Sequence, residues 1–499
     1  MSKSRAPGNL RLALGPLTLL YLALPLVIFF AGWLKPVPAV ISVVPLAFCG
    51  WKLARAWPAE LSTFRRGEIW FLAAFSFGLA AYAGIGAFAP QELDWAKHNA
   101  VMMDCITQPW PVLLTDGASH WPLVYYLAYY LPATVVGKWG GYAVAQVALW
   151  IWSGLGIMLA CGWFARLTQL PAWIAGPALF AFAGLVFIGN LVVQVLGLPD
   201  NYHGWVGYYP NEFWARIWQF PSHYWMLEWA PGQALSAWLS AGMFLSCPPS
   251  LRPFCFGFLF LCDLLWAPFS AIGLGLLAFF LVCREGLARP VKPLIPLLFL
   301  SLPAGALGVY YAAKISPEVV AQFPPIPIAW FARFQDAPPE LLSSVFLLML
   351  FATLEFGILW ALLRAVFPNG NGARNLADAS ALALCCLLPV TVGYYNDLAM
   401  RACAVPWFGL AVLAARALTS ATLTPRLRWW LGRVLFIGAL TPLIQIGEQG
   451  NKLLTGRYDP NVVPQRVSAV VHLPADGFKF LGAQYIGSTN SLYWKYLAR

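Results

Sequence analysis

The sequence predicts an all-α fold, a polytopic transmembrane helical bundle. Of its 499 residues, 60% are hydrophobic and only 10% are charged, whereas soluble domains carry roughly 25% charged residues. Apolar stretches recur along the whole chain, each near the roughly 20 residues that a helix needs to cross a bilayer. They lack the alternation that marks the strands of a membrane β-barrel. We therefore expect an integral membrane protein that contacts membrane lipids and has no nucleic-acid partner.

The apolar stretches predict about 13–15 membrane segments, some of them short or re-entrant. The first follows Lys3, Arg5 and Arg11 as a signal peptide would, but its length and the lack of a small-residue cleavage site predict a retained span. The predicted spans lie near residues 10–34, 37–56, 68–89, 121–138, 141–164, a pair within 171–198, 231–248, 252–266, 267–283, 292–313, 341–366, 378–395, 402–418 and 429–447.

Basic residues predict the orientation of these spans. With the N-terminus in the cytoplasm, more than half of the 31 basic residues fall in cytoplasmic turns, Lys138 among them, while Arg166 falls in an opposite loop. This distribution follows the positive-inside rule. The run 171–198 is hard to assign, because a single helix there would reverse the predicted side of the membrane for every later loop. We therefore expect it to be split near Gly184 into two shallow half-spans.

The predicted topology divides the chain into a transmembrane domain, residues 1–447, and an extracytoplasmic tail, residues 448–499. Three polar loops, 90–120, 198–230 and 314–340, lie on the same outer face as the tail. Most acidic residues also fall on this face, so the chemistry is expected there. The tail is too short for a sizeable core of its own and is expected to dock onto the outer loops.

The first outer loop, 90–120, contains the sequence Asp94-Trp95-Ala96-Lys97-His98 and, further on, Asp104. On a short helix, side chains three and four residues apart share one face, so Asp94, Lys97 and His98 would lie together. A carboxylate beside a cation can accept a proton from a hydroxyl group while the cation holds a phosphate. The alternative interpretation is a solvated helix with a surface ion pair.

The same loop continues through Trp110-Pro111 and re-enters the membrane at Trp121-Pro122-Leu123-Val124-Tyr125-Tyr126. This pattern resembles the first extracytoplasmic loop of the GT-C superfamily of glycosyltransferases, membrane enzymes that use polyprenyl-phosphate sugars. The many-span layout is similar as well. The resemblance implies that Asp94 is the general base that activates an acceptor hydroxyl, and that transfer inverts the anomeric centre. It also implies a polyprenyl-phosphate sugar donor and a lipid, glycan or protein acceptor.

No metal or other cofactor is predicted. Trp95, and not a second acidic residue, follows Asp94, and no Asp-x-Asp triplet occurs in the outer loops. A divalent ion therefore has no evident ligand set. The ten cysteines are scattered, most of them within apolar segments, and show neither metal-ligand spacing nor a disulfide framework.

The segment 198–230 is dense in aromatic residues and includes His223 and Glu228. Aromatic faces among hydrogen-bonding side chains suit stacking on sugar rings, which predicts contact with the sugar or the acceptor. The alternative is an interfacial belt along the lipid headgroups, because Trp and Tyr are enriched there.

A cation lies in one outer turn, although cations are scarce on the predicted outer face. The turn is Asn396-Asp397-Leu398-Ala399-Met400-Arg401. An arginine there suits bidentate binding of a lipid-linked phosphate. The alternative is a helical ion pair between Arg401 and Asp397, four residues earlier.

Two carboxyl groups, Asp263 and Glu355, fall within apolar runs, where an ionisable group faces a cavity or a partner or stays protonated. Asp263 is next to a predicted outer turn and is expected to line the site. Glu355 lies mid-span and is expected to be a neutral, hydrogen-bonded carboxyl between helices.

Together, these features predict an inverting membrane glycosyltransferase of the bacterial inner membrane, with its active site facing the periplasm. Asp94 is its predicted base. The predicted substrate-binding residues are Lys97, His98, Asp104, His223, Glu228, Asp263, Asn396, Asp397 and Arg401. One alternative is a transporter or flippase of a lipid-linked sugar that couples protons through Asp263 and Glu355. Another is a surface-glycan ligase or polymerase that uses a lipid-diphosphate donor.

Overall fold

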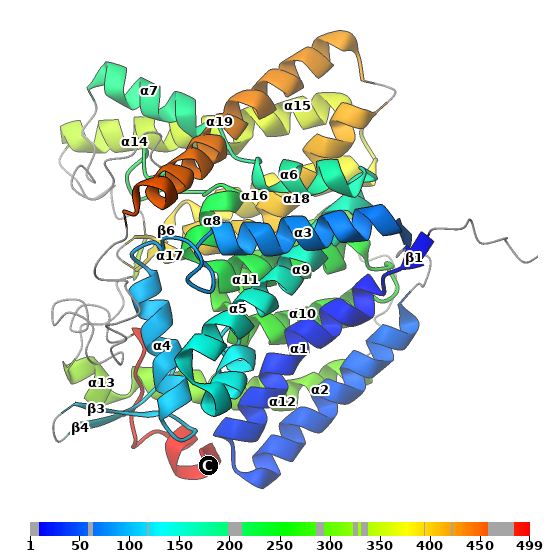
Figure 1. The fold of residues 1–499 in the computed structure, drawn as a ribbon. Coiled ribbons are helices and arrows are strands. Elements are labelled where there is room, and N and C mark those ends of the chain that lie inside the picture. The colour runs from blue at the N-terminus through cyan, green and yellow to red at the C-terminus, as the bar shows by residue number, and fades with distance from the viewer. Residues whose placement is uncertain are drawn as a thin grey trace, which may run out of the picture.

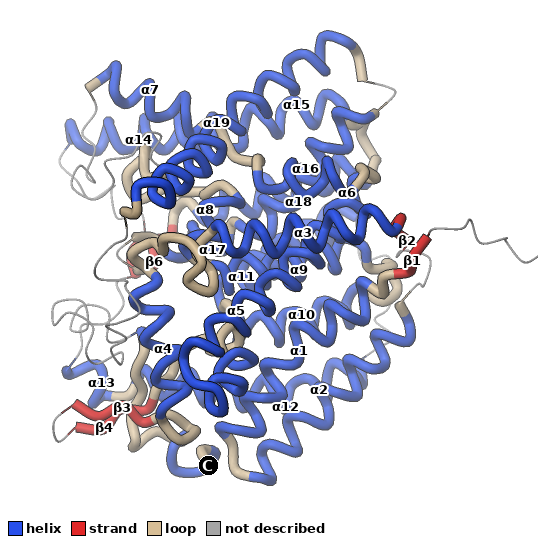
Figure 2. The backbone as a smooth tube through the Cα atoms, in the orientation of Figure 1, coloured by secondary structure: helices blue, strands red, loops and turns tan. Residues whose placement is uncertain are grey.

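The computed structural model of the chain is a bundle of helices, with three short two-stranded sheets among the residues that it describes (Figures 1 and 2). Most helices run between two ends of the molecule. The structure describes residues 9–57, 63–116, 119–197, 212–285, 294–322, 328–330, 338–393, 395–420, 423–457 and 484–499. Parts of the predicted outer loops 198–230 and 314–340 and of the tail lie outside the described residues.

Seven described helices are long and apolar enough to cross a membrane by length and composition, which confirms the prediction of a helical membrane protein. They are α1 (Leu14–Trp33), α2 (Pro36–Ala56), α5 (Leu131–Thr168), α11 (Pro268–Glu285), a segment Pro296–Val320 that includes most of α12 (Leu294–Ala312), a segment Ser344–Val366 and α19 (Pro425–Thr455). Shorter helices pack among them: α3 (Arg66–Tyr82), α9 (Pro231–Ser246), α10 (Arg252–Trp266), α16 (Gly372–Leu387) and α18 (Ala404–Thr419).

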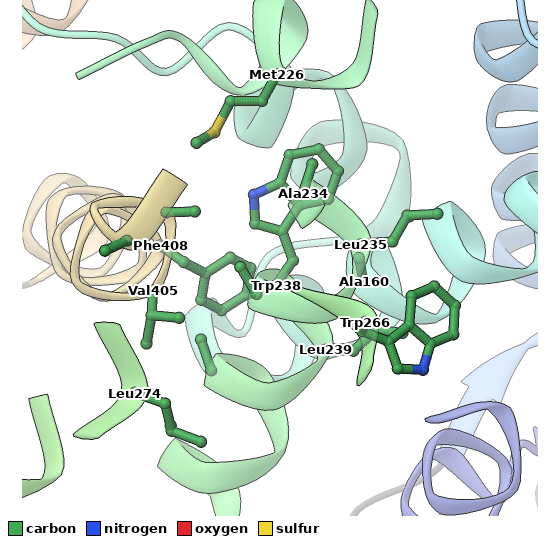
Figure 3. Close-up of a cluster of buried hydrophobic side chains, with 14 of the residues drawn as sticks. Ala160, Met226, Ala234, Leu235, Trp238, Leu239, Trp266, Leu274, Val405 and Phe408 are labelled. Atoms are coloured by element: carbon green, nitrogen blue, oxygen red, sulfur yellow. The ribbon is translucent and has the colours of Figure 1, made fainter. Parts of the chain in front are cut away.

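The centre of the bundle is α9, whose side chains are buried around most of its circumference. A helix without a polar face belongs in a protein interior or in lipid, and α9 lies against α5, α10, α11 and α18. Its Trp238 is fully buried, and Figure 3 shows the indole ring among side chains that include Met226 of α8 and Phe408 of α18. Helix α8 (His223–Trp229) leads directly into α9.

We name the two ends of the bundle by their composition. The polar end, at the left of Figure 1, carries α4 (Trp95–Thr107), the hairpin β3 (Leu113–Asp116) and β4 (Ser119–Pro122), and α17 (Asp397–Ala402). The basic end, at the right, carries β1 (Asn9–Arg11) paired with β2 (Thr63–Arg65). Helix ends rich in arginine gather there, at Arg252, Arg284, Arg364, Arg374, Arg416, Arg426 and Arg428.

The predicted span at 121–138 is wrong. Residues 119–122 form β4, residues 123–130 are not helical, and α5 begins only at Leu131. Lys138 lies at the polar end, where its Nζ donates to the carbonyl of Gln108 at 2.7 Å. The single helix α5, kinked at Gly141, then runs to the basic end and carries Arg166 there. The predicted sides of Lys138 and Arg166 are therefore exchanged.

The run 171–198 is broken where the sequence predicts, but it does not form two shallow half-spans. Helix α6 (Ala172–Phe180) and helix α7 (Val186–Leu196) are separated by residues 181–185. The Ala172 amide donates to Glu68 Oε1 at the start of α3, at the basic end, and α7 lies towards the polar end (Figure 1). The break packs against Gly438 in the middle of α19. The pair α6–α7 thus runs once between the two ends.

These two corrections compensate each other. The structure has one membrane crossing fewer than predicted before residue 171, because α5 replaces two predicted spans. It has one crossing more than predicted within 171–198, so α8 still lies at the same end as α4. Direct contacts agree, because Trp95 Nε1 in α4 donates to the carbonyl oxygen of Glu228 in α8 at 2.8 Å. Later elements therefore keep the sides that the sequence predicts.

The segment Ser344–Val366 is built from α14 (Pro338–Ala352), a π-helical turn η4 (Thr353–Gly357) and α15 (Ile358–Val366). At the polar end, α12 continues through η2 (Ala313–Ile315) to α13 (Pro317–Gln322). Strand β5 (Ile328–Trp330) pairs with β6 (Val390–Val392), just before α17.

The described part of the C-terminal tail, 484–499 with η8 (Tyr493–Leu497), docks onto the polar end as expected. The Val124 amide donates to the carbonyl of Tyr485 at 2.7 Å, and the Gly487 amide donates to the carbonyl of Pro122 at 2.8 Å. These bonds cover the apolar residues after β4 with protein. The predicted domain boundary at 447 falls within α19, which continues to Thr455.

The contact between α11 and α17 fixes the position of α17, and Gly273 permits it. A Cβ at Gly273 would overlap the carbonyl oxygen of Ala402. We expect Gly273→Ala to destabilise the protein by about 1–3 kcal/mol, the usual range for overpacking a core. Gly308→Ala in α12 meets open space and is expected to leave stability unchanged or to raise it. Thermal unfolding in detergent measures both, and a Gly273→Ala protein as stable as wild type would contradict the assignment.

Candidate functional site

The candidate site begins at the start of α4, where Asp94 precedes the first turn of the helix. The Lys97 ammonium pairs with Asp94 Oδ1 at 2.8 Å, and the two side chains remain 22% and 27% exposed, respectively. Burial raises the pKa of Asp94, but the charge and hydrogen bond of Lys97, helped by the charge of Arg401, outweigh it and hold the pKa below the ordinary value. Asp94 is therefore an ionised, accessible carboxylate at neutral pH.

Arg401 reaches the same place from α17. Its Nη2 donates to Asp397 Oδ1 at 2.8 Å, and its Nη1 donates to the Tyr126 hydroxyl at 2.8 Å. Its charge also acts on Asp94 and Lys97. The buried Nε of Arg401 has no hydrogen-bond partner among the described residues. A guanidinium has five N–H donors, so donors remain for a ligand.

Asn396 positions α17 and does not enter the charged cluster. It adopts a left-handed conformation with φ of 54°, and its Oδ1 caps the helix by accepting from the Ala399 amide. Its Nδ2 donates to the carbonyl of Ile217 at 3.0 Å. The residue thus joins α17 to the polypeptide that precedes α8.

Tyrosine rings surround the charged cluster. The rings of Tyr125 and Tyr126 lie 3.7 Å apart between centroids, and the ring of Tyr485 from the tail lies 4.7 Å from that of Tyr125. The charges of Asp94 and Lys97 act on Tyr485, and they also act on Tyr395. Tyr125 and Tyr126 belong to the re-entry motif in the sequence. Tyr485 has no sequence signal, because its contribution depends on how the tail docks.

His98 is buried beside the cluster and is held by protein groups. One ring nitrogen bonds the Tyr130 hydroxyl, and Nε2 donates to the carbonyl of Trp229 at 3.1 Å. Burial lowers the pKa of His98 to about 4, so the ring is neutral at pH 7. The sequence predicts His98 as a substrate-binding residue; in the structure both ring nitrogens bond protein groups and fasten α4 to α8 and to the start of α5.

Two of the other predicted residues, Asp104 and Asp263, lie away from the cluster. Asp104 is buried on α4, ten residues beyond Asp94, which is about 15 Å along a helix. Asp263 is buried in α10, where its Oδ1 accepts from Ser240 in α9 at 2.9 Å. It joins two core helices, so the prediction that it lines the site is corrected.

His223 and Glu228, both in α8, also lie outside the cluster. The His223 ring stacks on Trp238 with centroids 5.4 Å apart, inside the core. Glu228 is buried, and burial raises the pKa of its carboxyl well above the ordinary value, helped by the charge of Glu92. Glu92 itself forms an ion pair with Lys452 of α19. Neither residue belongs among those that would hold a donor phosphate beside Asp94.

The cavity of about 180 Å³ found in the described part of the protein is at the basic end. Arg252, Arg416, Glu285 and the first residues of α16 line it, together with apolar side chains. This cavity is separate from the cluster around Asp94.

Among the residues that the structure describes, no group of three or more His, Cys, Asp or Glu side chains is arranged to hold a metal ion. No family model, no curated protein and no solved structure matches the chain.

The cluster combines three kinds of side chain at the polar end of a membrane protein. Asp94 offers a proton acceptor, Lys97 and Arg401 offer two cations, and the tyrosines offer flat faces and hydroxyl groups. Such a set can bind an anionic group and accept a proton from a neighbouring hydroxyl. Aromatic faces suit the apolar sides of sugar rings.

We expect the neutral His98 to make the folded state sensitive to acid. The pKa of His98 is about 4 in the folded protein, against an ordinary 6.5. Between these values the unfolded chain binds a proton that the folded chain does not, so stability falls as the pH falls from 6.5 towards 4. His98→Gln removes this contribution, and its unfolding midpoint is expected to fall less between about pH 7 and pH 4.5.

Thermal unfolding in detergent at both pH values measures this effect. The matched control is His120→Gln, since His120 is exposed in β4. An unfolding midpoint that falls equally in wild type and His98→Gln would contradict the role of His98.

Proposed function

We propose that this protein is an inverting membrane glycosyltransferase that takes a sugar from a polyprenyl-phosphate carrier at the polar end. One observation carries the proposal: the 2.8 Å ion pair of Asp94 and Lys97 stays partly exposed at the polar end, where α17 also places Arg401. Two cations beside an ionised carboxylate match an anionic donor and a hydroxyl acceptor. The resemblance of the first outer loop to that of GT-C glycosyltransferases points to the same reaction class.

In the proposed reaction, Lys97 and Arg401 hold the phosphate of the donor. The acceptor hydroxyl gives its proton to the Asp94 carboxylate while its oxygen attacks the anomeric carbon from the face opposite the phosphate. The bond between the anomeric carbon and the phosphate oxygen breaks, and polyprenyl phosphate leaves with the bonding electrons. The anomeric centre is thereby inverted, and the charge of the leaving phosphate is balanced by the two cations.

The ion pair between Asp94 and Lys97 gives this scheme a sequence of events. Before the donor binds, Lys97 stabilises the Asp94 carboxylate and lowers its pKa, which makes it a weak base. A bound phosphate competes for the Lys97 ammonium. Asp94 then loses part of its stabilisation, so its pKa rises and it becomes a better base once the donor is in place.

The proposed location is the bacterial inner membrane, with the polar end towards the periplasm. The support is the distribution of arginines, which gather at the opposite end of the helices. A prenyl chain would partition into lipid between the helices while its charged head meets the cations at the polar end. The acceptor is proposed to be a lipid, a glycan or a protein outside the cytoplasm.

Asp94→Asn is expected to lower the rate of sugar transfer about 10²–10⁴-fold, the usual contribution of a general base. Donor binding should persist, because the cations remain. The measurement is transfer from a labelled polyprenyl-phosphate sugar by purified protein in lipid vesicles. The matched control is Glu285→Gln, which removes a carboxylate that forms a 2.8 Å ion pair with Arg252 at the basic end. Full activity in Asp94→Asn would exclude this carboxylate as the base.

Arg401→Gln is expected to weaken donor binding about 10–100-fold, since a hydrogen bond to a charged group contributes about 1.5–3 kcal/mol. Arg401→Lys keeps the charge and should restore part of the affinity. Titration of a polyprenyl-phosphate analogue, followed by protein fluorescence, measures the dissociation constant. Arg416→Gln, at an exposed position of the basic end, is the control. Equal affinities in Arg401→Gln and wild type would remove Arg401 from the site.

A second candidate function is transport of a lipid-linked sugar. The break between α6 and α7, in the middle of the bundle and against the carboxyl of Glu355, favours it, because broken helices at mid-membrane are common in transporters. A transporter moves the labelled donor across the vesicle membrane without forming a product. A ligase or polymerase accepts a lipid-diphosphate donor instead, so the same vesicle assay with both donors separates the three.

A further inference from the structure

Two buried carboxyl groups from segments far apart in the chain lie in the interior of the bundle. The first is Glu355, in the π-helical turn η4, with 2% of its surface exposed. Its Oε1 accepts from Trp214 Nε1 at 2.8 Å. Its Oε2 has no hydrogen-bond partner among the described residues and lies against Gly184, where a Cβ would overlap the carboxyl. π-Helical turns within α-helices often mark functional sites.

The second carboxyl is Glu212, which is 3% exposed. Its Oε1 accepts from the Ser222 amide at 3.1 Å and from Gln445 Nε2 at 3.0 Å. The Ser222 hydroxyl in turn donates to Gln445 Oε1 at 2.9 Å. Glu212 Oε2 has no partner in the described part of the chain. Each carboxyl is therefore fixed by one oxygen and leaves the other unsatisfied.

The two carboxyls lie in the same region of the interior. Trp214, whose Nε1 donates to Glu355 Oε1 at 2.8 Å, is only two residues after Glu212 in the chain. Gln445, which bonds Glu212, lies two turns along α19 from Gly438, which packs against the carbonyls of Ala183 and Gly184. The pair therefore sits beside the break between α6 and α7.

Thr441 provides evidence for a ligand that is independent of the two carboxyls. It lies on α19 between Gly438 and Gln445, spaced three and four residues from them, so all three share one face of the helix. Its side chain is fully buried, and its hydroxyl has no hydrogen-bond partner among the described residues. A buried hydroxyl without a partner is costly, and here it faces the region between the break and Glu212.

The two carboxyl groups have no ion-pair partners among the residues that the structure describes. Within the described ranges, neither Glu212 nor Glu355 forms an ion pair with a lysine, an arginine or a histidine. The titratable groups near the pair include Cys403, His223 and Arg216, and Arg216 Nη1 donates to Ser344 at 2.9 Å. Two carboxylates buried in the same region of the interior are both charged only at a high free-energy cost unless a cation balances them.

We propose that Glu212, Glu355, Thr441 and the carbonyls of the α6–α7 break form a buried binding site for a small monovalent cation, either Na⁺ or a proton. Carboxylate, hydroxyl and carbonyl oxygens are the donors that a hard cation takes. Unwound backbone at the ends of half-helices coordinates Na⁺ or protons in membrane transporters. A cation would satisfy the unpartnered oxygens and neutralise the pair. The site is distinct from the Asp94 cluster and does not depend on the proposed transferase activity.

The test uses the full-length protein in lipid nanodiscs, without any sugar donor. Equilibrium binding of radiolabelled Na⁺ is measured at neutral pH, with choline keeping the ionic strength constant. In parallel, infrared difference spectra between wild type and each variant report the C=O stretch of protonated carboxyl groups. The variants are Glu355→Gln and Glu212→Gln, with Asp263→Asn as a buried carboxyl on other helices.

Saturable Na⁺ binding that disappears in both glutamate variants but persists in Asp263→Asn supports a sodium site. Absence of Na⁺ binding, together with a protonated carboxyl band that both glutamate variants lose, supports a proton site. If wild type binds no Na⁺ and neither variant loses a protonated band, both carboxyls are ionised without a ligand and the proposal is overturned.

A second pair of variants keeps the test decisive if a glutamate variant fails to fold. Gly184→Ala places a Cβ on the Glu355 carboxyl, whereas Gly308→Ala meets open space. Gly184→Ala is expected to abolish Na⁺ binding or to shift the protonated band, and Gly308→Ala to leave both as in wild type. An unchanged signal in folded Gly184→Ala would also overturn the proposal.

Discussion

The hydrogen bonds of Arg401 organise the polar end of this protein. Its guanidinium joins Asp397 on its own helix to Tyr126 on the segment after β4, and its charge extends to Asp94 on α4. Each of these partners is held in place by other contacts. Asn396 caps the helix that carries Asp397, the tail covers Tyr125 beside Tyr126, and His98 fastens α4 to α8. Loss of the guanidinium would therefore remove the contact between α17 and the segment after β4.

Arg401 and Asp94 lie at the same end of the bundle because α4 and α17 do. Two features of the middle of the chain secure it: the single helix α5 leads from the polar end to the basic end, and the broken pair α6–α7 leads back. Breaking a helix inside the bundle leaves backbone groups without their helical partners, which is tolerated only where protein replaces lipid around them. Here the Leu185 amide donates to the carbonyl of Leu354, and α19 packs over the break.

The protein holds its carboxylates in two contrasting environments. Asp94 is partly exposed beside Lys97 and Arg401, so it is ionised and suited to accept a proton from a substrate. Glu212 and Glu355 are buried and form no ion pair in the described ranges, which is the basis for the proposed cation. The carboxyl group thus serves two chemistries because the surrounding charge differs.

The sequence by itself determined that the chain is a helical membrane protein with charge at two ends. It also determined the local pairs Asp94–Lys97 and Asp397–Arg401, because residues three and four apart on a helix are neighbours. Hydropathy misassigned the residues after Pro122, since apolar side chains covered by the tail have the same composition as those that face lipid. Only the tertiary structure decided that Arg401 and Tyr485 join Asp94, and that Glu212 joins Glu355. These contacts link segments far apart in the chain, so no sequence period records them.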